Sequence, residues 1–264
     1  DIKDKRRQKQ LIKNTIQLMT AATGVFVVRL SASDIKRIRS VAHDENDPLK
    51  MLLDKKNLNR TFQKCKNAHI DIASSIEAIV EMHDTDSTSA SSFVFLAYGV
   101  DPKTRVPVVK GIMTCSRFVS SDMFTTSEAD IEPSNYTTLG PYFGKNLLID
   151  TLCSLEKGVG RVLILHAYDV AHRKGFDGVI ALSYSNKPIS DSNRPASEST
   201  FLSLGFTRLI DNAKFASDYD DMFGHWFHKP THSAEGLNQM LLALCTRSGL
   251  KGKAAESLIW RCPV

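Results

Sequence analysis

Two glycines lie one residue apart in the segment LEKGVGRVLILHA, residues 155–167. The apolar run NLLIDTLC precedes them and an amphipathic run follows, so the pattern predicts a strand, a tight turn and a helix. The first N–H groups of a helix lack partners and carry partial positive charge, which favours a bound phosphate. Glycine lets the backbone approach such an anion closely. Lys157 and Arg161 flank the turn and could add charged contacts.

The turn matches no common phosphate-loop pattern in full. Nothing in the chain matches the P-loop pattern GxxxxGK[ST]. The dinucleotide pattern GxGxxG begins at Gly158 and Gly160, but Leu163 stands where its third glycine would be. From this pattern alone, the turn can serve packing as well as it can serve phosphate binding.

A carboxyl group interrupts the strand before the turn. Asp150 is the one charged residue in the run LLIDTL, residues 147–152. Loss of hydration would raise its pKa and make it a usable general base. A structural hydrogen bond is the alternative role, because a buried carboxyl group without a partner is costly.

The elements around these residues predict an α/β fold with a mixed central sheet. Two strands joined by the turn 101–104 form an antiparallel hairpin, whereas strand–helix–strand units favour parallel pairing. Polar loops are expected at 120–144 and 185–197. The predicted helices are 1–22, 34–42, 47–83 in two pieces, 158–174, 198–204 and 233–248. The predicted strands are 25–30, 93–98, 106–119, 146–153, 179–183, 206–210, 225–228 and 257–262.

A longer stretch carries the pattern of a known family. The run LEKGVGRVLILHAYDVAHRKGFDGVIALS, followed by ESTFLSLGFTRL, resembles the GNAT acetyltransferase superfamily. That family places [RQ]xxGx[GA] between its fourth strand and third helix, and Gly158 and Gly160 match the two small residues. The segments KGF, 174–176, and LGF, 204–206, match later family elements. The resemblance implies an N-terminal helix at 1–23, a GNAT-like domain at 24–230 and a C-terminal extension at 231–264.

The resemblance also implies an N-acetyltransferase that uses acetyl-CoA or another acyl-CoA as its cofactor. In that reading the backbone of Leu152 and Cys153 pairs with the pantetheine arm, and Asn193 lies near the asparagine that fixes the family's short helix. The acyl group passes directly to an amine, and Asp150 is the candidate base. The N–H groups that would hold the pyrophosphate belong to Lys157, Gly158, Val159, Gly160 and Arg161.

Three positions depart from the family pattern. Leu155 replaces its leading Arg or Gln, and Asn193 lies one residue farther along than expected. Phe201 stands where many members have a tyrosine that protonates the departing thiolate. Tyr184 is a candidate for that acid, although a half-exposed aromatic without a catalytic role is the alternative.

The acceptor is expected to be a primary amine. In the resembled fold, Asp218, Asp220 and Asp221 border the acceptor groove, and carboxylates there favour a cation. We therefore expect a lysine in the basic tail of a protein, such as a histone tail. The alternatives are a small amine such as a polyamine, and a catalytically weak acyl-CoA-binding scaffold. The terminal segments suggest that such a scaffold belongs to a larger chromatin or kinetochore assembly.

Composition sets the remaining limits. The net charge of +5 is too small to require a nucleic acid, and no apolar run is long enough to span a membrane. Five scattered cysteines without a CxxC pair predict reduced thiols in the nucleus or cytoplasm. No metal site is expected, because His225 and His228 fall on opposite faces of a strand.

Overall fold

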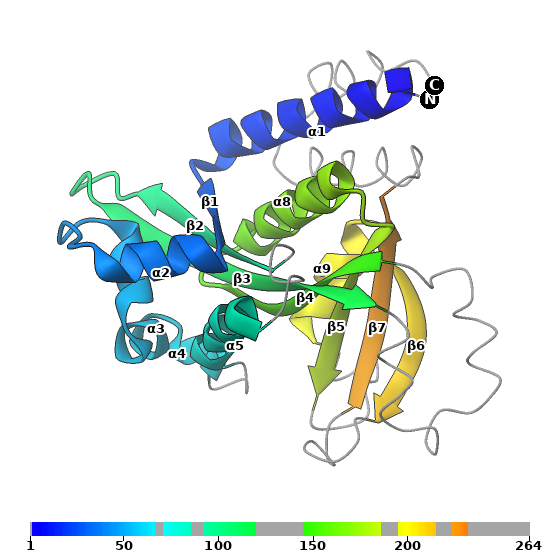
Figure 1. Cartoon of the computed structure of the whole chain (residues 1–264). Coiled ribbons are helices and arrows are strands. Elements are labelled where there is room, and N and C mark those ends of the chain that lie inside the picture. Colours follow the sequence, from blue (N-terminus) through cyan, green and yellow to red (C-terminus); the bar gives the residue numbers. More distant parts are fainter. Residues whose placement is uncertain are drawn as a thin grey trace. The chain divides into compact units, whose positions relative to one another are not determined.

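Seven strands among the described residues form one sheet, in the order β1-β2-β3-β4-β5-β7-β6, in this computed structural model (Figure 1). The structure describes residues 2–66, 71–85, 92–119, 145–185, 195–214 and 223–231. The strands are β1 (Phe26–Ser31), β2 (Phe93–Val100), β3 (Pro107–Val119), β4 (Lys145–Ser154), β5 (Gly178–Ser185), β6 (Thr207–Lys214) and β7 (Phe223–Pro230). The helices are α1 (Ile2–Thr23), α2 (Ala32–Ser40), the 3-10 helix η1 (Pro48–Leu53), α3 (Lys55–Thr61), α4 (Gln63–Lys66), α5 (Ile72–Thr85), α8 (Val159–Lys174) and α9 (Ala196–Ser203).

Most neighbouring strands are antiparallel. The pairs β1–β2, β2–β3, β5–β7 and β6–β7 all run in opposite directions. The helix α8 joins the neighbours β4 and β5, and a helical crossover is the usual connection between parallel strands. The predicted α/β fold with a mixed sheet and flanking helices is therefore confirmed, as is the hairpin between β2 and β3.

Chain contacts divide the protein into two compact units. Unit 1 comprises residues 1–15, 118–148 and 168–264, and unit 2 comprises residues 16–117 and 149–167. The predicted division into an N-terminal helix, a central domain and a C-terminal extension, with boundaries at residues 23 and 230, stays a prediction. The predicted loop 120–144, the helix 233–248 and the strand 257–262 lie outside the described residues.

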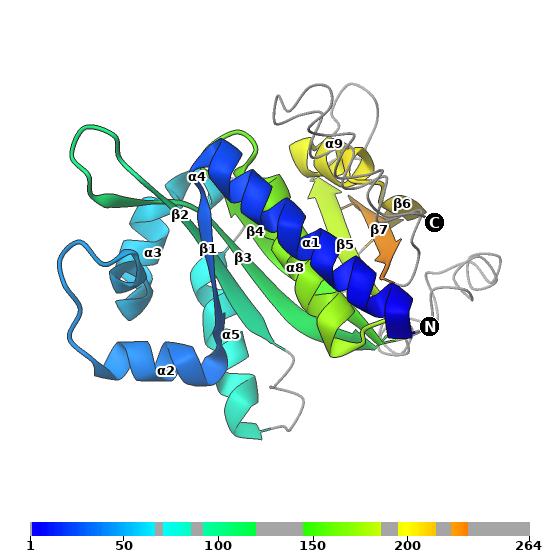
Figure 2. The same cartoon turned by 90° about the horizontal axis from the view of Figure 1, so that it is seen from above.

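Unit 2 has its own hydrophobic core. Figure 1 shows α2 to α5 on one side of its strands, and Figure 2 shows β1, β2 and β3 side by side. Buried side chains such as Ile35 of α2, Ile76 of α5 and Leu96 of β2 fill the space between these layers. Arg39 donates two hydrogen bonds to the carboxylate of Glu77, at 2.6 and 3.2 Å, and so links α2 to α5.

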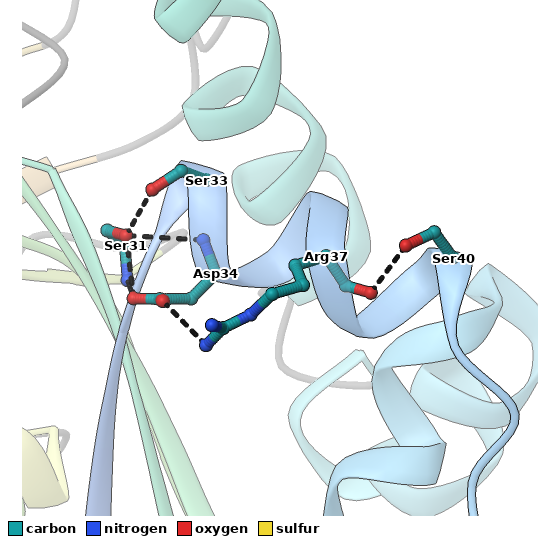
Figure 3. Close-up of polar contacts among 5 residues, drawn as sticks. All are labelled: Ser31, Ser33, Asp34, Arg37 and Ser40. Atoms are coloured by element: carbon teal, nitrogen blue, oxygen red, sulfur yellow. Dashed lines mark hydrogen bonds and ion pairs between the residues drawn. The ribbon is translucent and has the colours of Figure 1, made fainter.

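The start of α2 shows how local sequence fixes a helix end. The Ser31 hydroxyl oxygen accepts from the N–H of Asp34, and the Asp34 carboxylate accepts from the N–H of Ser31 (Figure 3). This reciprocal capping box satisfies two N–H groups that the helix leaves unpaired. Ser31 is therefore the N-cap of α2.

The segment between β1 and β2 corrects the expected two-part helix. In place of the helix predicted at 47–83 in two pieces, the described residues form four helical pieces, η1, α3, α4 and α5. Aspartates start two of them: Asp47 caps η1 and Asp54 caps α3 through backbone N–H groups. Asp71 accepts from the N–H of Ser74 in the first turn of α5. Each carboxylate competes with continuous helix by offering the backbone a local partner.

The prediction that the cysteines are reduced thiols is wrong for one pair. Cys65 of α4 and Cys153 of β4 form a disulfide whose Cα atoms are 6.0 Å apart, and Cys115 is a buried free thiol. The predicted reduced state fails because the fold brings together two residues that are 88 positions apart in sequence.

Unit 1 has a core of aromatic and polar side chains beside β5 and β7. The Phe201 ring packs against Phe206 and Phe227, with ring centroids 5.3 and 5.5 Å away. His228 lies 3.1 Å from Asn146 Oδ1 and is buried. No helix in the described part of the chain is long and apolar enough to cross a membrane.

Candidate functional site

The glycine turn follows β4 and opens α8, as the sequence predicts. Gly158 has φ +91°, a backbone conformation that side-chain-bearing residues rarely adopt, and the space where a Cβ would stand is open. A Cβ on Gly160 would lie 3.7 Å from the Ser154 Cβ and 3.9 Å from a Leu152 methyl carbon, which is ordinary contact. Gly158 is therefore required for its conformation, whereas Gly160 is not.

Some N–H groups at the turn make no hydrogen bond within the described part of the chain. The N–H groups of Arg161 and Val162 both donate to the carbonyl oxygen of Gly158, and that of Val159 donates to Glu156. Those of Lys157, Gly158 and Gly160 make no hydrogen bond with another described residue. They stand at the positive end of the α8 dipole, where an anion is stabilised.

Contacts from β3 hold the turn in place. Lys110 Nζ lies 2.8 Å from Glu156 Oε2, and the N–H of Leu155 donates to the carbonyl oxygen of Lys110 at 2.8 Å. The Ser154 hydroxyl donates to the carbonyl oxygen of Glu156 at 2.6 Å. The backbone of the turn is thus fixed before any ligand arrives.

A third glycine allows α8 to approach the sheet. A Cβ on Gly111 of β3 would stand 2.9 Å from both the Cys153 carbonyl oxygen and a Val159 methyl carbon, closer than real Cβ contacts. The first turn of α8 can therefore pack on β3 only where β3 has no side chain. Gly111 is not among the residues predicted from the sequence, although an isolated glycine inside a predicted strand often marks such a close approach.

Asp150 lies on β4, four residues before the end of that strand. Part of the residue is exposed to water, but protein atoms surround its carboxyl group, and Oδ1 accepts a hydrogen bond of 2.8 Å from the hydroxyl of Ser116 on β3. The surrounding protein removes part of the carboxyl group's hydration and raises its pKa to about 7, while the Ser116 hydrogen bond acts in the opposite direction. A carboxyl group with a pKa near neutrality is suited to proton transfer.

Unit 2 contains most of the predicted site residues. Leu152 is half-buried beside Gly160, and Lys157 is exposed. The Cys153 side chain is buried and bonded to Cys65, so only its backbone could meet a ligand. The predicted roles of Leu152 and Cys153 toward a cofactor stay predictions.

The other predicted site residues lie outside unit 2, the unit that contains Asp150. Tyr184 stands near the end of β5 in unit 1, opposite Gly224 in the register. Phe201 is 2% exposed and belongs to the core of unit 1. Asn193 lies outside the described residues. Their proposed contributions stay predictions.

Ser116 is the polar neighbour that sequence reasoning missed. It lies in the run TCS near the end of the predicted strand, which gives no sign that its partner is Asp150, 34 positions later. Only the register between β3 and β4 brings the two side chains together.

Comparisons with known proteins identify structural neighbours and no relatives by sequence. No family model and no curated protein matches the chain. One similar structure is an N-acetyltransferase from Staphylococcus aureus Mu50, with 12% identity and a TM-score of 0.43 over 79% of this chain and 99% of that one. A second is FeeM, an N-acyl amino acid synthase from uncultured soil microbes, with 12% identity and a TM-score of 0.45 over 83% and 98% of the two chains.

A third similar structure is BjaI, a CoA-dependent acyl-homoserine lactone synthase solved with SAM and isopentyl-CoA. Its identity is 12% and its TM-score is 0.44, over 90% of this chain and 100% of that one. We base the functional proposal on the residues of the chain itself.

Proposed function

We propose that the chain is an acyl-CoA-dependent N-acyltransferase that acts on a primary amine. One observation carries this proposal: β4 bears a carboxyl group with a raised pKa and runs directly into a turn in which some N–H groups bond to no other described residue. The same strand thus offers a proton acceptor and an anion site. The sequence resemblance to GNAT acetyltransferases supports the same reading.

The residues of the turn suit the phosphates of a coenzyme A thioester. Gly158 leaves open the space that a side chain would fill, and the N–H groups of Lys157, Gly158 and Gly160 bond to no other described residue. The exposed ammonium group of Lys157 adds a positive charge. When bound, acyl-CoA supplies an acyl group activated as a thioester.

Asp150 is the residue that would accept the proton of the attacking amine. Its Oδ1 accepts from Ser116 and its Oδ2 bonds to no other described residue, so Oδ2 is the oxygen that would take the proton. A pKa near 7 lets the carboxylate gain and lose this proton at neutral pH without a large penalty in either direction. The amine then reacts with the acyl group directly, and no enzyme nucleophile is required.

For the acceptor we propose a lysine side chain in a basic protein tail, with a histone tail as the first substrate to test. The support is the acidic segment of Asp218, Asp220 and Asp221, which lies outside the described residues. Carboxylates beside a binding site favour a cationic acceptor. A small amine is the alternative that the same charges would accept.

Calorimetry with acetyl-CoA tests the anion site first. We expect micromolar binding by the wild type and loss of that binding in Gly158→Glu, because the new carboxylate would oppose the phosphates. Gly24→Glu is a matched control, since Gly24 also has a positive φ, +64°, and open space at its Cβ position. Equal weakening by both substitutions, or no binding by the wild type, would refute this cofactor site.

Turnover assays then test the base. In Asp150→Asn we expect acetyl-CoA binding to persist and the acyl-transfer rate to fall by about 10²–10⁴, the usual contribution of a general base. Histone-tail peptides and polyamines should be assayed in parallel, because a preference for peptides would separate the two acceptor classes. Binding without turnover on any amine would leave an acyl-CoA-binding scaffold.

A further inference from the structure

Ser116 contacts the proposed base directly and belongs to a different strand. Its half-buried hydroxyl donates to Asp150 Oδ1 over 2.8 Å, from β3 to β4. We propose that Ser116 is the positioning residue of the site, which holds the Asp150 carboxylate in place and favours its ionised form over its neutral form. This inference rests on the proposed function of Asp150 as the general base.

The geometry gives Ser116 two effects on the carboxylate. A hydrogen bond to Oδ1 fixes the rotation of the carboxyl group, so Oδ2 is held in one direction for the proton of the amine. The same bond stabilises the charged form over the neutral form, because a hydroxyl donor bonds more strongly to a carboxylate than to a carboxylic acid.

Other groups near Asp150 do not replace this contact. The influences on its pKa are the loss of hydration, which raises it, and the Ser116 hydrogen bond, which lowers it; no lysine, arginine or histidine of the described residues contributes. Among the described residues, Cys115 of β3 is a nearby titratable group, and burial raises the pKa of its thiol well above the ordinary value. Cys115 therefore stays neutral and supplies no charge.

A second hydroxyl contact joins the same two strands and provides a matched control. Thr114 Oγ1 of β3 and Thr151 Oγ1 of β4 are 2.6 Å apart. Thr114→Val removes this contact with little change in shape and leaves the Ser116–Asp150 pair intact. It therefore reports what loosening the β3–β4 pairing does by itself.

The first measurement is the titration of the Asp150 carboxyl carbon by NMR in the wild type, Ser116→Ala, Ser116→Thr and Thr114→Val. Removing the donor in Ser116→Ala should raise the midpoint for Asp150 by about one pH unit, because hydrogen bonds to charged groups shift pKa values by this order. Ser116→Thr keeps the hydroxyl and should restore the wild-type midpoint, and Thr114→Val should leave it unchanged. An unchanged midpoint in Ser116→Ala, or an equal change in Thr114→Val, would overturn the inference.

The second measurement is the pH dependence of acyl transfer in the same variants. The acid limb of the rate profile for Ser116→Ala should move upward with the NMR midpoint, so the rate at pH 7 falls about fivefold while the high-pH plateau falls less. If the NMR midpoint moves and the rate profile does not follow it, Ser116 still tunes the carboxyl group and the assignment of Asp150 as the base is wrong. The two ideas can therefore fail separately.

Discussion

The two glycines of the turn should respond in opposite ways to the same substitution. Gly158→Ala places a Cβ on a residue with φ +91°, whereas Gly160→Ala places one on a residue in the first turn of α8. Neither new methyl group meets a close neighbour: nothing lies within 4 Å of the position at Gly158, and the contacts at Gly160 are 3.7 and 3.9 Å. Neither position is crowded, so backbone conformation is the main difference between the two variants.

The magnitudes follow from that difference. An L-residue held in a left-handed conformation costs about 1–2 kcal/mol, so Gly158→Ala should lower the free energy of unfolding by about that amount. Alanine is preferred over glycine in a helix by about 0.5–1 kcal/mol, so Gly160→Ala should be neutral or stabilising by up to that amount. The two variants should differ by about 1–3 kcal/mol.

Urea unfolding of the two variants and the wild type, followed by circular dichroism, measures this difference. Titration of the same samples with acetyl-CoA measures a second property, the affinity for the cofactor. Relaxation of the backbone in Gly158→Ala would turn neighbouring N–H groups away from the proposed anion site. Gly160→Ala leaves the helical backbone unchanged, so its N–H group keeps its direction. Affinity should therefore fall about tenfold in Gly158→Ala, equivalent to about 1.4 kcal/mol, and stay near the wild-type value in Gly160→Ala.

Two results would refute the reasoning. If Gly158→Ala were as stable as the wild type, the left-handed conformation at the turn would not be required by the fold. If Gly160→Ala were the more damaging variant, the first turn of α8 would pack against β4 more tightly than its contacts with Leu152 and Ser154 indicate.

Two further predictions concern stability. Burial lowers the pKa of His228 to about 4, so on acidification the unfolded state takes up a proton before the folded state does. The free energy of unfolding should therefore fall between pH 6.5 and pH 4, by up to about 3 kcal/mol. Urea unfolding across this range should show a weaker pH dependence of that free energy in His228→Gln than in the wild type. Replacing Cys65 with serine removes a disulfide between residues 88 positions apart and should lower the free energy of unfolding by about 2–5 kcal/mol. Wild type treated with dithiothreitol should show the same decrease, which would assign it to the lost bond and not to the serine.

Local signals were sufficient to predict the strand, turn and helix that carry the site. Gly158, the apolar run of β4 and the amphipathic run of α8 are contiguous, so their pattern is set by neighbours in sequence. The same is true of the Ser31 cap, whose partner Asp34 is three residues away. Such interactions depend on short-range geometry, which sequence spacing describes well.

Contacts between distant segments were not predictable in this way. The Ser116–Asp150 pair depends on how β3 aligns with β4, and a shift of one residue would turn either side chain to the other face. The Cys65–Cys153 bond depends on how α4 packs, and five cysteines allow many pairings. The split of the helical segment at Asp47, Asp54 and Asp71 was readable in principle, since aspartate is a common N-cap.

The proposed base on β4 and the proposed anion site directly after it are held at a fixed separation. Asp150 and Ser154 are separated by about 13 Å along an extended strand, and the anion site follows at once. An acyl-CoA carries its thioester far from its phosphates, so a base and a phosphate site must be held apart at a fixed distance. Contacts from β3 brace β4 near both ends of this span, through Ser116 at Asp150 and through Lys110 at Glu156. Changes at the Lys110 end should therefore alter cofactor affinity, whereas changes at the Ser116 end should alter the pH dependence of turnover.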